Sequence, residues 1–143
     1  MAFIATASAR DIASLAAISN LSDVQHSDVI DIRDTQSCTI GSLPRARCLP
    51  VGHFVDRNGT VISFHALRWL LGTVGLTGGE TVLVIGAAPE DTHRVGALLH
   101  QAGQRRVLML DKPFHAPANA PSGTPRSLSR ETVFTAPMRA DLN

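Results

Sequence analysis

The run Thr81–Ile85 constrains the fold more than any other segment, because its five residues are apolar or β-branched and do not alternate with polar ones. A strand with that pattern is buried on both faces, as in a parallel sheet covered by helices. A helix is predicted directly after it, over residues 92–102, because Val95, Leu98 and Leu99 fall on one stripe before Gly103. A strand followed by a helix is the repeating unit of α/β proteins.

Other segments repeat this order. Short β-branched or apolar runs predict strands over residues 28–32, 47–51 and 107–110. A helix ending at Gly75 is predicted by the spacing of four apolar residues: Leu67, Leu70, Leu71 and Val74. A further helix is predicted from the capping-box pattern at Ser8 through Leu15 and Ala16. We therefore expect a three-layer α/β/α fold around a mainly parallel sheet of about five strands.

Composition excludes several classes of function. The 143 residues hold 13 Lys+Arg and 12 Asp+Glu, so the chain lacks the positive field that nucleic acid or an anionic membrane would require. The six histidines and two cysteines show no metal-ligand spacing, and neither a metal nor a cofactor is expected. No basic residue precedes Arg10 and no sustained apolar stretch begins the chain, so we expect a cytoplasmic protein.

The composition changes at Lys112, after which the chain holds five of its eight prolines. Residues 115–130 contain one large aliphatic residue, Leu128, and are expected to cross the surface or to be mobile. The more apolar segment 131–135 suits an extended strap docked on the body. We expect a domain over residues 1–114 and a C-terminal extension rich in Pro, Ala and Ser over residues 115–143.

Three motifs, in order and at the right spacing, resemble the rhodanese-like domain. The first is Asp31-Ile32-Arg33 followed by GSLPRARCLP at residues 41–50, where the family has D-V-R and G-H-I-P-G-A-x-N-I-P. The second joins the strand at 82–85 to the helix ending at Gly103, and the third is VLMLDKPF at residues 107–114. Together they cover roughly residues 3–114. The resemblance implies the α/β fold expected above.

The resemblance also implies a reaction, the transfer of a sulfane sulfur through a cysteine persulfide in the loop after the central strand. In this chain that position is Gly86, which has no side chain to carry sulfur. The loop continues as Ala87, Ala88, Pro89, Glu90, Asp91 and Thr92. Pro89 removes one amide from the anion cradle, and the carboxylates of Glu90 and Asp91 would repel an anion at the helix start. Lys112-Pro113 also replaces the family's glycine pair.

Four residues outside this loop are candidates for a site. Cys48, flanked by Arg45 and Arg47, is predicted near the carboxyl end of a strand, where a displaced catalytic thiol is conceivable. The alternative for Cys48, and for Cys38, is a small buried hydrophobic residue; a disulfide is not implied. Asp31 and Arg33 could bind a ligand, but a structural bond from Asp31 to loop amides is favoured. Trp69 is predicted to fill the core; an exposed Trp69 would mark a binding surface.

The leading hypothesis is a catalytically inactive rhodanese-like module that binds, regulates or serves as a scaffold. Its binding candidates are Asp31, Arg33, Gly86, Glu90 and Asp91, and its partner is an unspecified protein or small molecule. The first alternative is an atypical sulfurtransferase that uses Cys48. The second is a small-molecule sensor that uses the space left at Gly86, Ala87 and Ala88.

Overall fold

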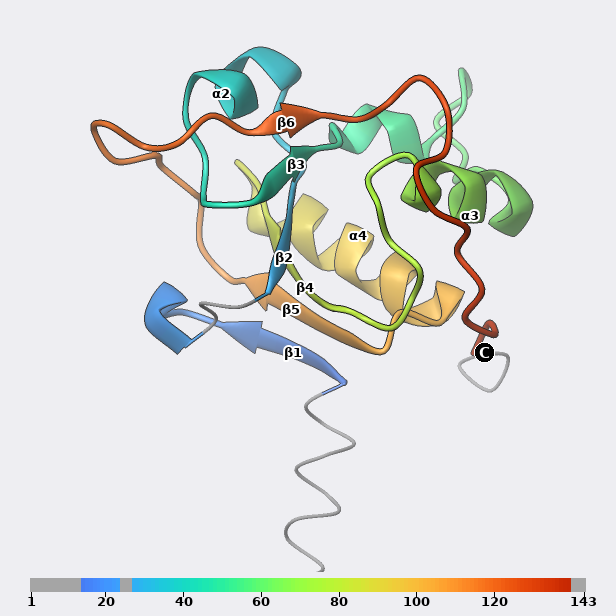
Figure 1. The fold of residues 1–143 in the computed structure, drawn as a ribbon. Helices are drawn as coiled ribbons and strands as arrows, with labels where there is room; N and C mark the ends of the chain where they lie inside the picture. The colour runs from blue at the N-terminus through green and yellow to red at the C-terminus, as the bar shows by residue number, and fades with distance from the viewer. Residues whose placement is uncertain (1–13, 24–26, 140–143) are drawn as a thin grey trace, which may run out of the picture.

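The computed structural model describes residues 14–23 and 27–139. Its strands form one sheet in the order β1-β5-β4-β2-β3-β6, with parallel pairing at every step (Figure 1). The strands are β1 (Leu15–Ile18), β2 (Asp28–Asp31), β3 (Ala46–Cys48), β4 (Thr81–Ile85), β5 (Arg106–Leu110) and β6 (Thr124–Pro125). The helical elements are η1 (Leu21–Asp23), α2 (Thr35–Ile40), η2 (Val51–Phe54), α3 (Phe64–Gly72) and α4 (Pro89–Ala102). The predicted α/β fold with a mainly parallel sheet is confirmed.

The central strand β4 is buried on both faces, as its pattern predicted. Val82 and Val84 face a larger core that includes Leu67 and Leu71 of α3 and Leu99 of α4. Leu83 and Ile85 face a smaller core. Figure 1 shows α3 and α4 on the same side of the sheet. The smaller core is completed by Phe114, η1 and the turn after α2.

Local signals located both α3 and α4, but α3 ends at Gly72, so Val74 and Gly75 of the predicted helix lie in the turn after it. Ser63 caps α3 by accepting a hydrogen bond from the Ala66 N–H at 3.1 Å. Helix α4 ends where Gly103 adopts a φ of 112°, a left-handed conformation that suits glycine. It begins at Pro89, three residues before the predicted start, because proline is well tolerated in the first turn of a helix.

The helix predicted from Ser8 to Ala16 is wrong at its end. Leu15 and Ala16 belong to β1, which pairs with β5 in the register Leu15↔Val107 and Ala16↔Leu108. Pairing with a distant strand outweighs the local helical spacing here. Residues 8–13 of that prediction lie outside the described residues.

Residues 115–139, here called the C-terminal strap, run back over the body after β5 (Figure 1). β6 extends the sheet beyond β3, which adds a strand to the expected five. Further along, Phe134 is 3% exposed and packs in the larger core. The Arg139 guanidinium donates to the carbonyls of His100 and Gln104 at the end of α4. The domain boundary at residue 114 stays a prediction.

Candidate functional site: the carboxyl edge of the sheet

The loop that replaces the sulfur-carrying loop lies at the carboxyl ends of β2 and β4. The register Asp31↔Ile85 brings these two strand ends level, and the Ile32 N–H donates to the Ile85 carbonyl at 2.9 Å. Gly86 follows directly and leads into α4 through residues 87 and 88. Ligand sites of open parallel sheets lie at this edge, so it is the first place to look for chemistry.

The position of Gly86 is closed by its neighbours. A Cβ built there would lie 2.8 Å from Cγ1 of Ile32 and 2.9 Å from Oγ1 of Thr92. Both distances are shorter than ordinary packing contacts allow, so a cysteine would need these side chains to move. Thr92 is itself fully buried. The space that a ligand would use at Gly86 is therefore filled, which weakens the hypothesis of a sensor pocket there.

The start of α4 offers an anion few hydrogen-bond donors. Pro89 has no N–H, and the backbone N–H groups of Asp91 and Thr92 both donate to the Ala88 carbonyl at 3.1 Å. Glu90 and Asp91 add two carboxylates to the first turn, where they favour the helix by opposing its dipole. Asp91 lies 4.0 Å from Arg94. This arrangement stabilises a helix start and disfavours a bound oxyanion.

Asp31 and Arg33 form a closed network beside this loop. Asp31 is completely buried, and Oδ2 accepts hydrogen bonds from Nη2 of Arg33 and from Oγ of Ser42, each at 2.7 Å. Its Oδ1 accepts the Arg33 N–H and Nε, each at 3.0 Å. Nη2 of Arg33 also donates to the Gly41 carbonyl at 2.6 Å. A buried carboxylate with this many donors holds the turn between β2 and β3 in place.

Phe114 connects that network to the loop. The Arg33 guanidinium lies over the Phe114 ring, 4.8 Å from its centroid, and the Phe114 N–H donates to the Gly86 carbonyl at 2.9 Å. Asp31, Arg33 and Gly86 are thus brought together, whereas Glu90 is exposed on the first turn of α4. Asp31 and Arg33 bond to one another and to the surrounding chain.

The two cysteines form a disulfide between α2 and β3. Cys38 and Cys48 are both buried, and their Cα atoms are 5.9 Å apart. The expectation of a free thiol at Cys48 is therefore wrong for this structure. Cys48 pairs in register with Asp31 on β2, and β2 separates it from β4. Two strand spacings, about 10 Å, thus lie between Cys48 and the loop at Gly86. Nothing in the sequence pattern alone brings α2 against β3.

Trp69 is 40% exposed, so the prediction that it fills the core is wrong. It lies on the outer side of α3, whereas Leu70 and Leu71 face inward. The side chains around Trp69 that come from the C-terminal strap could not be found from the sequence, because no local pattern places residues 130–138 beside α3.

Within residues 14–23 and 27–139, no three His, Cys, Asp or Glu side chains gather closely enough to hold a metal ion. None of the helices in that part of the chain combines the length and hydrophobicity of a membrane span. The cytoplasmic location stays a prediction.

No protein-family model matches the chain, and no curated protein matches it. Among solved structures, the chain is similar to the Rhodanese_3-like domain of the Alr3790 protein from Anabaena sp.. The two are 24% identical with a TM-score of 0.45, over 62% of this chain and 85% of that one. A second structure of the Alr3790 protein is 26% identical with a TM-score of 0.43, over 59% of this chain and 56% of that one.

Proposed function

We propose that this chain is a rhodanese-like domain without persulfide chemistry that serves as a binding, regulatory or scaffold module. The three motifs at residues 31–50, 82–103 and 107–114 support the family. The main support for the loss of activity is Gly86, which has no side chain and whose Cβ position is filled by its neighbours. Sulfur transfer of this kind requires a thiolate that both attacks the donor and holds the sulfur.

Two further observations support the loss. The first turn of α4 carries Glu90 and Asp91 where an anionic sulfur donor would bind, and the inward-bonded amides of Asp91 and Thr92 leave that donor few partners. The sulfur atoms of Cys38 and Cys48 are bonded to each other in a disulfide. Oxidised sulfur of this kind is not a nucleophile.

A thiosulfate:cyanide assay tests the proposal, with an active rhodanese as the positive control. The purified protein is expected to form thiocyanate no faster than buffer alone, both as prepared and after reduction of the disulfide and removal of the reductant. Gly86→Cys alone is expected to remain inactive, because Ile32 and Thr92 occupy the space that a side chain needs.

The atypical sulfurtransferase that uses Cys48 is the outcome that would overturn the proposal. It requires thiocyanate formation by the reduced protein that Cys48→Ser abolishes and Cys38→Ser retains. It also requires a mass increase of about 32 Da on Cys48 after thiosulfate treatment, the addition of one sulfur atom as a persulfide.

A further inference from the structure

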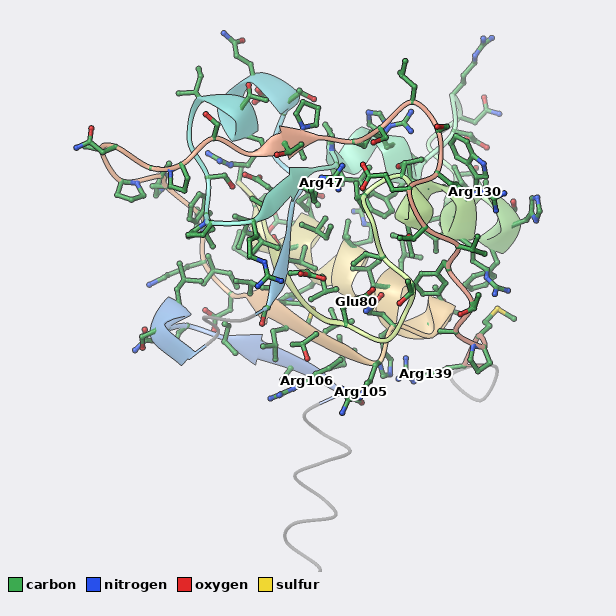
Figure 2. All side chains as sticks on the ribbon, viewed as in Figure 1. Arg47, Glu80, Arg105, Arg106, Arg130 and Arg139 are labelled. Atoms are coloured by element: carbon green, nitrogen blue, oxygen red, sulfur yellow. A yellow bond between two sulfur atoms is a disulfide. The ribbon has the colours of Figure 1, made fainter. Side chains whose placement is uncertain are left out.

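A groove of about 500 Å³ lies between α3 and the C-terminal strap, away from the loop at Gly86. We call it the α3 groove. Four of its lining residues come from α3: Phe64, His65, Arg68 and Trp69. Four more come from the strap: Arg130, Val133, Phe134 and Met138. Figure 2 shows Arg130 beside α3.

Exposed apolar surface gathers in this groove. Trp69 is 40% exposed, Val133 55% and Met138 45%. Six large hydrophobic side chains are exposed in the described part of the chain, and these three all line the groove. Apolar side chains that are exposed together, with polar groups at their edge, mark a binding surface more often than scattered ones do.

The strap wall of the groove is held in place by contacts with the body. The Arg68 guanidinium donates to the Phe134 carbonyl at 3.0 Å, and the Phe134 ring is buried in the core. Before it, Oγ1 of Thr132 donates to the Leu76 carbonyl at 2.8 Å, and the Glu131 N–H donates to the Gly72 carbonyl at 2.9 Å. The groove is therefore formed without a ligand, as most small-molecule sites are.

Among the described residues, no acid pairs with the cations that line the groove. It is lined by two arginines and a histidine and by no carboxylate. Within residues 14–23 and 27–139, the Arg130 guanidinium makes no hydrogen bond or ion pair. The adjacent carboxylate of Glu131 accepts hydrogen bonds from both Nη atoms of Arg47, at 2.9 and 2.7 Å, and does not neutralise Arg130. An anion that enters the groove meets cations that no carboxylate among the described lining residues neutralises.

We propose that the α3 groove binds a small organic anion with an aromatic or aliphatic body. The body contacts the indole of Trp69 with Val133 and Met138, and its carboxylate or phosphate pairs with Arg130, whose planar guanidinium suits such a group. The volume falls within the range of small-molecule sites. The groove shares no residue with the loop at 86–92, so this proposal stands or falls independently of the loss of sulfur transfer.

Trp69 is the single tryptophan of the chain, so its indole N–H gives one resolved NMR signal that reports from inside the groove. The probe is 4-phenylbutyrate, compared with the neutral 4-phenylbutanol. Titration with the anion is expected to shift the indole signal and saturate at millimolar concentration or below. The alcohol is expected to bind at least about tenfold more weakly, since it lacks a charge-assisted hydrogen bond.

Arg130→Gln is expected to weaken binding of 4-phenylbutyrate about tenfold and to leave the weaker binding of 4-phenylbutanol unchanged. Arg94→Gln, on the exposed side of α4, is the matched control and should bind as the parent does. Unchanged thermal unfolding of each variant shows that the groove is intact. Equal affinity for acid and alcohol, or no effect of Arg130→Gln, would overturn the proposal.

An indole signal that shifts with protein concentration alone would also overturn it, because a second copy of the chain would then occupy the groove. The thiosulfate assay does not depend on this result. If 4-phenylbutyrate does not bind and no thiocyanate forms, the proposed groove ligand is rejected and the proposed loss of sulfur transfer is retained.

Discussion

The carboxyl edge of the sheet and the α3 groove differ in how their polar groups are used. At the edge, Asp31 and Arg33 form hydrogen bonds with each other and with the surrounding chain. Neighbouring side chains cover Gly86. In the groove, the Arg130 guanidinium is unpaired among the described residues and Trp69 is partly exposed.

The region that resembles a known family is therefore not the region that is open to a ligand. The sequence motifs direct attention to the edge, where related chemistry would occur, and there the packing is tight. The capacity to bind a ligand lies instead where the C-terminal strap crosses α3, a contact that no motif describes. A fold therefore identifies where to look, and the side chains decide what can happen there.

The largest expected loss of stability comes from breaking the ion pair at the carboxyl edge of the sheet. Asp31→Asn leaves the Arg33 side chain, which is 11% exposed, without its carboxylate and should lower the free energy of unfolding by about 3–5 kcal/mol, measured by urea denaturation. Asp91→Asn, which alters an acid in the first turn of α4, should cost about 1 kcal/mol or less. A comparable loss for the two variants would contradict the contrast between a closed network and a solvated acid.

The disulfide should have the next largest effect. Cys38 and Cys48 close a short loop, with a sequence separation of 10, and its reduction should lower the free energy of unfolding by about 2–3 kcal/mol. A Cβ on Gly123 would meet both sulfur atoms, so the strap packs directly on this bond. The doubly substituted Cys38→Ser/Cys48→Ser protein should not respond to reductant. Identical urea curves for oxidised and reduced parent protein would show that the bond does not stabilise the fold.

Filling Gly86 should have an intermediate effect. Gly86→Cys overpacks the edge against Ile32 and Thr92 and should lower the free energy of unfolding by about 1–3 kcal/mol. Ile32→Ala removes two of the atoms in its way, so the double variant should lose less than the sum of the two single losses, by at least about 0.5 kcal/mol. Urea denaturation of all four proteins measures this coupling. Simple additivity would mean that Ile32 does not close the position.

The smallest effect is expected beside the groove. Hydrogen bonds from the Arg47 guanidinium, with a further one from Ser127, lower the pKa of Glu131 from 4.5 to about 2. Since the folded pKa lies below the unfolded one, the stabilisation is present above about pH 4.5 and is lost as the pH falls towards 2. The Glu131 side chain is 37% exposed, so solvent screening limits its contribution to about 1 kcal/mol or less.

Glu131→Gln should therefore be slightly less stable than the parent at pH 7, and the difference should vanish near pH 2. Thermal unfolding at a series of pH values measures it, and Arg47→Gln should flatten the same part of the profile. A difference that persists unchanged at pH 2 would mean that the ionised pair is not its source. Binding of 4-phenylbutyrate should be retained in Glu131→Gln, because Glu131 does not line the groove.

The predictions that succeeded rest on short-range patterns. Residues 81–85 lack alternation because both faces of β4 are buried, and the stripe of Val95 and Leu99 marks the inner side of α4. The stop of α4 at Gly103 was equally local, whereas α3 ends at Gly72 and not at the predicted Gly75. The absence of a side chain at Gly86 could also be read from the chain, once its motifs were placed in order.

The predictions that failed depended on distant partners. Leu15 and Ala16 have helical spacing, yet pairing with β5 draws them into β1. Trp69 has apolar neighbours in the sequence but lies on the outer side of α3. The bond between Cys38 and Cys48 depends on how α2 packs against β3, which neither spacing nor composition specifies.

By itself, then, the sequence determined that the chain forms a parallel α/β sheet and that no sulfur atom follows its central strand. Those properties follow from residue type and from periodicities of two to four residues. Only the tertiary structure decided that Ile32 and Thr92 close the position of Gly86, that the cysteines are joined, and that Arg130 and Trp69 line one groove. Each of these contacts joins different structural elements, and packing density rather than local propensity determines which side chains meet.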